Sequence, residues 1–263
     1  MHMHRFYLPP AACREDVLHL AGPEAHHASR VLRLKPGDEA VVQDGAGHEL
    51  FCEVEKTSRD ELSLRVKKRN FVPPPPCALT LFVAIPRGKI IESIIQKSVE
   101  LGVQKLAPLL TERVVTRLDE SDALRKHEQW RQTAIEAMKQ SGAPRLPEIE
   151  IPAPLENFLA RKEKPELQIV GSLQKERRHP REVFREYQNA QSHPPTSAAA
   201  WIGPEGDFSP DELQAIISAG ASPITLGSLV LRVETAAVYC LSIFNYEFNT
   251  PGEQDKRGLE TKT

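Results

Sequence analysis

Two charged residues stand inside an otherwise apolar segment of the chain. Arg232 and Glu234 lie between Leu229-Val230-Leu231 and Ala236-Ala237-Val238. A guanidinium in apolar surroundings can stabilise negative charge that develops on a reactant, and a carboxylate beside it can accept a proton or orient the guanidinium. The pair can also be a structural salt bridge or two charges at the start of a helix. This segment alone leaves both interpretations open.

Two glycine-containing loops follow predicted strands near these charges. Gly203-Pro204-Glu205-Gly206 comes after the apolar run 198–202, and Ser209 and Glu212 have the spacing of a capping box that opens a helix. Leu226-Gly227-Ser228 follows a second short apolar run. Ligands bind at the carboxyl ends of parallel strands in open α/β sheets, and glycine lets the backbone approach a ligand closely. The loops are therefore candidate ligand sites, although the first can equally be only a tight turn.

Several familiar sites are disfavoured by the spacing of residues. Neither loop has the GxGxxG or GxxxxGK pattern of a dinucleotide site or a P-loop, and no HExxH or GxSxG motif occurs. The four cysteines, Cys13, Cys52, Cys77 and Cys240, are scattered. Their spacing disfavours a zinc knuckle or a disulfide framework and indicates buried thiols in a reducing compartment. The histidine pairs near the start lack further ligands, so we expect no metal.

The elements that position these residues belong to two regions with different sequence patterns. Four consecutive prolines at 73–76 form a stiff linker between the two regions. Before the prolines, apolar and polar residues alternate, as at 50–54, which predicts half-buried strands and a small β-barrel over residues 1–72. After them, apolar runs alternate with helical stripes. This predicts an α/β domain over residues 77–250, with a parallel sheet covered by helices on both faces. The charged tail 251–263 is expected to be disordered.

Composition limits the class of protein. The chain has 263 residues, 40% of them apolar, with 34 lysines and arginines against 36 aspartates and glutamates, which is typical of a globular chain of about two domains. No apolar run reaches the roughly 18 residues of a membrane span, and no signal-peptide pattern is seen, so we expect a cytoplasmic protein. The formal net charge of -2 indicates no general affinity for polyanions. Nucleic-acid contact therefore needs a local basic patch, and the candidates are Arg30, Arg33, Lys35, Lys67, Lys68, Arg69 and Arg87.

Longer stretches around the two loops resemble a known family. GPEGDFSPDEL and LGSLVLRVETA, preceded by PRGKIIESIIQKSVELGVQKLAPLLTERVV and EAMKQSG, look like the motifs of the ribosomal RNA small subunit methyltransferase E family. The resemblance covers nearly the whole chain. It implies a PUA-like RNA-binding barrel in front of a SPOUT domain, whose trefoil knot binds S-adenosylmethionine. It also implies a homodimer that methylates N3 of one uridine in 16S ribosomal RNA.

The resemblance further implies roles for individual residues. From the chemistry of that reaction we hypothesise that Arg232 and Glu234 are catalytic: Arg232 stabilises a uracil anion, and Glu234 accepts the N3 proton or orients Arg232. No metal is required for this chemistry. The barrel and the basic residues named above become the RNA-binding part. Binding of S-adenosylmethionine is assigned to Leu173, Gly203, Pro204, Glu205, Gly206, Leu226, Gly227 and Leu231.

Three positions depart from the usual motifs of the family. Asp207 replaces the second of two paired glycines, Leu229 replaces an arginine, and Lys139 stands where many relatives carry an acid. Asp207 can alter the loop or add a polar contact, and Leu229 removes one expected contact to RNA or to the cofactor loop. Two alternatives therefore stay open. One is another SPOUT methyltransferase that acts on transfer RNA or on a ribose hydroxyl, and the other is a catalytically idle RNA-binding or ribosome-assembly factor with the same fold.

Overall fold

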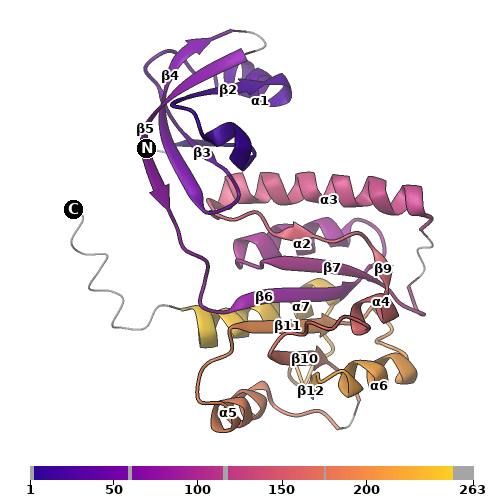
Figure 1. Ribbon diagram of the computed structural model, residues 1–263. Helices are drawn as coiled ribbons and strands as arrows, with labels where there is room; N and C mark the ends of the chain where they lie inside the picture. Colours follow the sequence, from indigo (N-terminus) through magenta and orange to yellow (C-terminus); the bar gives the residue numbers. More distant parts are fainter. Residues whose placement is uncertain (1–2, 59–60, 115–117, 175, 251–263) are drawn as a thin grey trace. The chain divides into compact units, whose positions relative to one another are not determined.

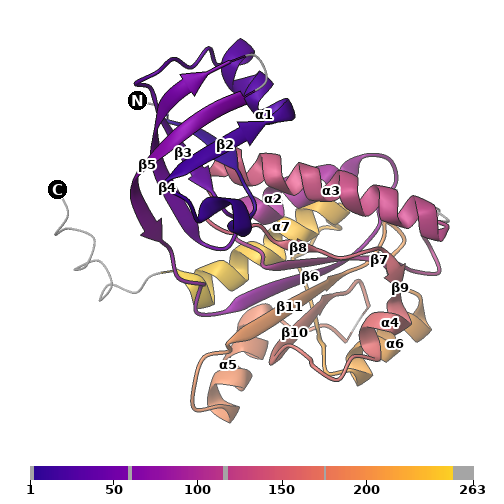
Figure 2. The same ribbon diagram turned by 45° about the horizontal axis from the view of Figure 1, so that its top comes forward.

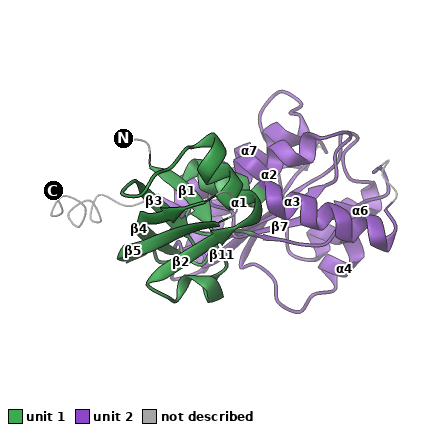
Figure 3. Cartoon of the chain, turned by 90° about the horizontal axis from the view of Figure 1, so that it is seen from above, with its two compact units in different colours: residues 1–74, 134–147 green, residues 75–133, 148–263 purple. Residues whose placement is uncertain are grey.

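The chain folds into two compact units. A computed structural model of the protein describes residues 3–58, 61–114, 118–174 and 176–250 (Figure 1). Unit 1 consists of residues 1–74 and 134–147, and unit 2 consists of residues 75–133 and 148–263 (Figure 3). The long helix α3 (Glu120–Ser141) therefore begins in unit 2 and ends in unit 1.

Unit 1 contains a five-stranded sheet with the spatial order β1-β3-β4-β5-β2. Its strands are β1 (His4–Tyr7), β2 (Val17–Ala21), β3 (Glu39–Gln43), β4 (His48–Thr57) and β5 (Glu61–Phe71). β1 and β3 pair in parallel, and the other neighbours are antiparallel. The connections contain the short helices η1 (Pro10–Cys13), α1 (Gly22–His26) and η2 (His27–Val31).

The alternation of apolar and polar residues is confirmed in this sheet. Leu50, Cys52 and Val54 of β4 are buried, while Glu53 and Glu55 next to them are only half-buried. Apolar side chains from all five strands join them in one continuous core. Because each buried Å² of apolar surface contributes about 25 cal/mol, this shared face holds the strands together.

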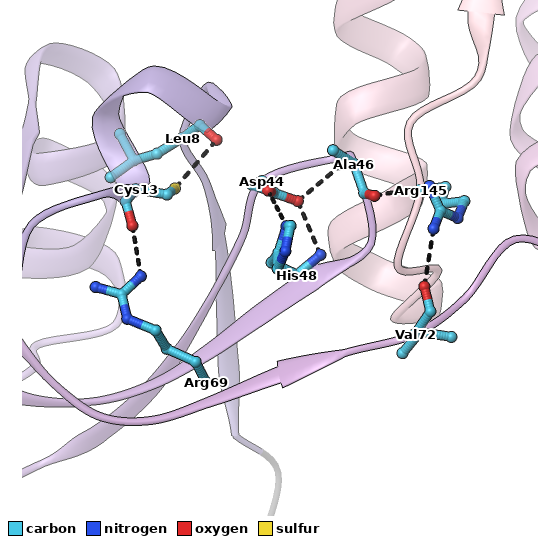
Figure 4. Close-up of polar contacts among 8 residues, drawn as sticks. All are labelled: Leu8, Cys13, Asp44, Ala46, His48, Arg69, Val72 and Arg145. Carbon is cyan, nitrogen blue, oxygen red and sulfur yellow. Dashed lines mark hydrogen bonds and ion pairs between the residues drawn. The ribbon is translucent and has the colours of Figure 1, made fainter.

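Residues 134–147 complete unit 1 by hydrogen bonding to its loops. The guanidinium of Arg145 donates to the Ala46 carbonyl over 2.7 Å and to the Val72 carbonyl over 2.9 Å (Figure 4). Gly47 has a φ of 109°, and a Cβ at this residue would lie 2.6 Å from Arg145 Nη2, so only glycine leaves room for the guanidinium. Sequence pattern alone assigns residues 134–147 to the second domain. These backbone carbonyls, which are distant in sequence, are the reason that the segment lies in unit 1.

A half-buried ion pair fixes the end of α3 to α1. Lys139 Nζ lies 2.6 Å from Glu24 Oε1 and 2.8 Å from Glu136 Oε1, and the Lys139 side chain is 12% exposed. Burial lowers the pKa of Lys139, but hydrogen bonds to the two carboxylates outweigh burial and raise this pKa above its ordinary value. An acid at this position would face Glu24, which gives a physical reason for lysine here.

Lys139→Met is expected to lower the free energy of unfolding by roughly 1–3 kcal/mol at neutral pH, because the half-buried Glu24 carboxylate would lose its cation. Since the pKa of Lys139 is raised on folding, its stabilisation is complete below the unfolded-state pKa and disappears as pH rises through the folded-state pKa. Urea denaturation measures both effects. Lys97→Met, at an exposed position of α2 (Ile90–Glu100), is the control and should cost less than about 0.5 kcal/mol. Equal losses in the two variants would contradict the assignment.

Unit 2 is built on a parallel sheet, as predicted. Its strands follow the order β12-β10-β11-β6-β7-β8, and β9 also pairs with β7. All of these pairs are parallel. The strands are β6 (Ala78–Ala84), β7 (Lys105–Leu110), β8 (Glu148–Ile149), β9 (Ala153–Pro154), β10 (Leu167–Gly171), β11 (Ser197–Ile202) and β12 (Ser222–Ile224).

Helices cover both faces of this parallel sheet (Figure 2). On one face, α7 (Val233–Phe244) packs against β6, β11 and α2, and η3 (Asn245–Asn249) continues α7. On the other face, α4 (Leu155–Leu159) and α6 (Pro210–Ser218) pack over Phe82 and Trp201, whose ring centroids are 3.8 Å apart. The remaining helix, α5 (Pro180–Ala190), lies between β10 and β11 in the chain. The predicted capping box of α6 is confirmed, because Ser209 and Glu212 each accept the other's backbone N–H.

Two further features of the described residues concern the helices and the cysteines. No helix within the described ranges is both long enough and apolar enough to cross a membrane. All four cysteines are buried. Burial raises the pKa of Cys13, Cys52 and Cys77 to about 11 and that of Cys240 to about 12, so these thiols stay protonated near neutral pH. The tail 251–263, for which disorder is predicted, lies outside the described residues.

Candidate functional site

A cavity of about 410 Å³ lies in unit 2 where three neighbouring strands end. Its walls are the segments that follow β10, β11 and β12, namely residues 171–173, residues 203–205 with 207, and residues 226–231. Ile90 of α2, Arg177, Ile202 at the end of β11, Arg232 and the first turn of α7 complete the lining. The volume is within the range of small-molecule sites, and the carboxyl edge of a parallel sheet is where such ligands bind.

The wall after β11 is a tight turn that requires glycine at its start. The N–H of Asp207 donates to the Pro204 carbonyl over 2.9 Å and closes the turn. A Cβ at Gly203 would lie 2.9 Å from the backbone nitrogen of Phe208 and 3.2 Å from Asp207 Oδ1. No side chain fits there unless the backbone moves. Gly203 therefore forms a tight turn and also borders the cavity.

The wall after β12 carries exposed apolar side chains. Thr225 holds its start, since the hydroxyl accepts the Gly227 N–H over 3.3 Å and donates to the Gly227 carbonyl over 3.1 Å. Gly227 has a φ of 116°, a conformation that favours glycine. Leu229 and Val230 line the cavity and yet are 77% and 75% exposed. Adjacent apolar side chains beside a cavity are typical of a surface that contacts a ligand or another molecule.

The wall after β10 is short and is joined to both other walls. The N–H of Ser172 donates to the Ile224 carbonyl over 3.1 Å. A Cβ at Gly171 would lie 3.3 Å from Leu226 Cδ1, so these two walls approach closely. The N–H of Leu173 donates to Asp207 Oδ2 over 3.2 Å. Hydrogen bonds therefore connect the wall after β10 to the last residue of β12 and to Asp207 of the wall after β11.

Arg232 and Glu234 lie at the rim of the cavity where α7 begins. Arg232 occupies the N-cap position and Glu234 lies in the first turn of the helix, where a carboxylate is favoured by the helix dipole. Arg232 is exposed and Glu234 is half-buried. Within the described ranges, neither side chain forms a hydrogen bond or an ion pair, so the structural salt bridge considered from the sequence receives no support. Both charged groups can reach a molecule bound in the cavity.

All but one of the predicted cofactor and catalytic residues line the cavity: Leu173, Gly203, Pro204, Glu205, Leu226, Gly227, Leu231, Arg232 and Glu234. The exception is Gly206, whose carbonyl accepts a hydrogen bond from the Arg113 guanidinium. Arg113 and the cavity-lining Arg177 were not predicted. Arg113 lies in the quoted stretch that ends in TERVV, but that stretch does not show which loop its side chain meets, and Arg177 lies outside the quoted motifs. The roles of the lining residues in binding and catalysis stay predictions.

Two of the predicted RNA-binding residues already have partners in unit 1. Lys67 is paired with Glu53 of the neighbouring strand over 3.0 Å. Arg69 donates to the carbonyl of Cys13 over 2.6 Å and to that of Glu15 over 2.7 Å (Figure 4 shows the Cys13 bond). Arg69 thus holds the connection between β1 and β2 against β5, and this structural role is invisible in a run of basic residues.

The other predicted RNA-binding residues are exposed, as Lys67 and Arg69 also are. Arg30, Arg33 and Lys35 are exposed in and after η2. Lys68 is exposed, with its ammonium 5.9 Å from the centre of the Phe51 ring. In unit 2, Arg87 is exposed, and its backbone N–H donates to Glu205 Oε1 over 3.1 Å. All seven predicted basic residues are therefore exposed, and Arg69 has a structural role in addition.

Known RNA methyltransferases share this sequence pattern and fold. Residues 73–245 match a family described as an RNA methyltransferase domain, and residues 20–67 match an RNA methyltransferase PUA domain. The fold and the cavity thus define an RNA methyltransferase domain joined to a PUA domain. The ribosomal RNA small subunit methyltransferase E of Aquifex aeolicus is 30% identical over 92% of this chain and 98% of its own length. The chain belongs to the ribosomal RNA small subunit methyltransferase E family.

Further relatives give the same result. The Bacillus subtilis protein of that name is 29% identical over 87% of this chain and 89% of its own length. A methyltransferase from Legionella pneumophila, solved in complex with the bound cofactor SAM, is 30% identical. It covers 95% of this chain and 100% of its own, with a TM-score of 0.84. The Neisseria gonorrhoeae enzyme, at 24% identity and a TM-score of 0.81 over 94% of this chain and 98% of its own, shares the fold.

Proposed function

We propose that this protein transfers a methyl group from S-adenosylmethionine to N3 of a uridine in the 16S ribosomal RNA of the small subunit. The observation that carries the proposal is the meeting of both glycine motifs, Arg232 and Glu234 at one cavity. Family membership supports the reaction class, because the relatives are named as ribosomal RNA small subunit methyltransferases. The Legionella pneumophila relative, which was solved with SAM, supports the cofactor.

The residues around the cavity fit S-adenosylmethionine. The glycine turns offer backbone groups for hydrogen bonds to adenine and ribose, and Leu226 and Leu231 offer apolar surface for the ring. The lining includes the acidic residues Glu205, Asp207 and Glu234 and the basic residues Arg177 and Arg232, so charges of both signs border the cavity. When bound, the cofactor supplies a methyl group on a positively charged sulfur, and the electron pair of the broken S–C bond stays on that sulfur.

The protein's own residues must prepare the uracil. N3 of uracil carries a proton at neutral pH, so it becomes a nucleophile only as that proton leaves. In our proposal Arg232 donates hydrogen bonds to the uracil carbonyl oxygens, where negative charge develops. Glu234 either accepts the N3 proton or orients Arg232. The cavity walls hold the reactants in line, which supplies much of the rate enhancement.

The barrel of residues 1–72 is the proposed RNA-binding domain. Residues 77–250, apart from the segment 134–147 that lies in unit 1, form the proposed methyltransferase domain. Arg30, Arg33, Lys35 and Lys68 are exposed cations of the barrel that suit RNA phosphates. We further infer a trefoil knot, a homodimer and a cytoplasmic location. The exposed Leu229 and Val230 beside the cavity are consistent with a partner subunit covering this loop.

Two experiments test the proposed function. Calorimetry with S-adenosylmethionine and a chelator should give a saturable heat signal, because the cavity needs no metal. Mapping of methylated nucleosides in ribosomal RNA from a strain that lacks the gene should show loss of one N3-methyluridine in 16S RNA. Loss of a transfer RNA or ribose methyl group instead would favour another methyltransferase activity. If calorimetry gives no heat signal with either S-adenosylmethionine or S-adenosylhomocysteine at high micromolar concentration, the catalytically idle assembly factor is favoured.

The single-turnover methylation rate is expected to rise with pH until the enzyme unfolds or its base is fully deprotonated. The physical reason is that uracil N3 loses its proton only well above neutral pH, so a higher pH increases the reactive fraction. Quenched-flow transfer of a radiolabelled methyl group measures this rate. In Glu234→Gln, loss of a base would remove most activity and change the pH profile, whereas loss of an orienting group would cost less and keep its shape. A rate that falls as pH rises would contradict deprotonation at N3.

A further inference from the structure

Asp207 adopts a backbone conformation that ordinarily belongs to glycine. Its φ is 63°, in the left-handed region, where a side chain is disfavoured by contact between Cβ and the backbone. The usual family motif has glycine at this position. A residue that keeps an unfavourable backbone conformation needs compensating contacts from its side chain.

Both carboxylate oxygens of Asp207 provide such contacts. Oδ1 accepts the N–H of Phe208 over 2.8 Å, and Oδ2 accepts the N–H of Leu173 over 3.2 Å. Phe208 follows the wall after β11, while Leu173 belongs to the wall after β10. The side chain is half-buried and lines the cavity. One carboxylate therefore bridges two walls that come from neighbouring strands and are 34 residues apart in sequence.

We propose that Asp207 is a positioning residue that fixes the distance between these two walls and thereby sets the affinity of the cavity for S-adenosylmethionine. The inference rests on the proposed function. A glycine at this position would form the turn with less strain but would leave the Leu173 N–H without this acceptor. The Asp207 carboxylate thus connects the wall after β11 to the wall after β10 through hydrogen bonds that a glycine cannot make. Preorganised walls bind more tightly because less conformational freedom is lost on binding.

Asp207→Gly is the direct test, because it relieves the backbone strain and removes both hydrogen bonds of the carboxylate. It also removes a negative charge, and S-adenosylhomocysteine, which lacks the sulfonium, separates the effect of that charge from the effect of the bridge. We expect the dissociation constants of S-adenosylmethionine and S-adenosylhomocysteine to rise in parallel by about tenfold, the size expected when hydrogen bonds to a charged group are lost. Asp207→Asn should give an intermediate value, because an amide oxygen can accept only one of the two N–H groups while its NH₂ group cannot accept the other. Calorimetry measures all of these affinities.

Asp38→Gly is the matched control. Asp38 lies in unit 1, and its carboxylate also accepts a backbone N–H, that of Lys35, over 2.7 Å. Its removal should leave both dissociation constants unchanged. Amide hydrogen exchange without ligand provides a second readout, since Leu173 should lose protection in Asp207→Gly and keep it in Asp38→Gly.

The outcomes separate this inference from the proposed function. If the unaltered protein binds neither ligand, the proposed function fails and the positioning role falls with it. If the unaltered protein binds both ligands and Asp207→Gly binds them equally well, the positioning role alone is overturned. If Asp207→Gly loses affinity for S-adenosylmethionine alone, the positioning role is also overturned, because this would show a direct effect of charge on the sulfonium. Three results together would establish the positioning role. Asp207→Gly loses affinity for both ligands in parallel, Asp207→Asn recovers part of this affinity, and the Leu173 amide exchanges faster in Asp207→Gly.

Discussion

Arg232→Ala is expected to lower the single-turnover methylation rate by about 10²-fold or more. Arg232 lies at the rim of the cavity, and within the described ranges its guanidinium makes no hydrogen bond or ion pair. It can therefore direct all of its donors to the uracil oxygens, where charge develops in the transition state. Removal of one such contact has an effect of this size in other enzymes. The dissociation constant of S-adenosylmethionine should change by less than about threefold, because the contact is made to the RNA base.

Arg125→Ala is the matched control for this prediction. Arg125 is exposed on α3 and pairs with Asp122 one turn away, so its loss should leave the rate unchanged. Saturating RNA and cofactor ensure that the rate reports the chemical step. If Arg232→Ala methylates RNA at the unaltered rate under these conditions, Arg232 is a structural charge at the start of α7.

Gly203→Val is expected to weaken binding of S-adenosylmethionine by about 10²-fold or more while the protein still folds. A Cβ at this position would lie 2.9 Å from the Phe208 backbone nitrogen, and that backbone cannot yield as a flexible side chain would. The turn must therefore open, which displaces the wall of the cavity. Calorimetry measures the affinity, and circular dichroism with thermal unfolding checks the fold.

Gly206→Ala in the same turn is the informative comparison. A Cβ there would meet only Arg113 Cδ at 3.6 Å, an ordinary contact, and Gly206 does not line the cavity. We expect a change in affinity of less than about threefold. Equal losses from Gly203→Val and Gly206→Ala would mean that the loop tolerates no side chain at all and that the geometry at Gly203 is not the cause.

Local patterns predicted the parts of this fold that local physics determines. The alternation around Leu50 and the capping box of Ser209 and Glu212 each depend on neighbours a few residues away, and both are confirmed. The two glycine loops were placed at one edge because parallel strands must end together. The cavity lies at that edge and is lined by both loops and by Arg232.

Partners that are distant in sequence could not be predicted in this way. Arg145 meets the carbonyls of Ala46 and Val72 only because the chain returns to unit 1. The basic run predicts that Arg69 is a cation available to RNA, yet its guanidinium donates hydrogen bonds to carbonyls of the connection between β1 and β2. A run of charges carries no information about which carbonyls will lie beside it, so the structural role of each was hidden.

The return of residues 134–147 to unit 1 also bears on how the protein is made. During synthesis the first 74 residues emerge first, but their remaining partners in this unit follow 73 residues later, when residue 147 has been added. At roughly 5–20 residues per second, this delay is about 4–15 s. Meanwhile Glu24 lacks Lys139, and the loop at Gly47 lacks Arg145. Unit 1 therefore cannot be complete before β6 and β7 of unit 2 have been translated.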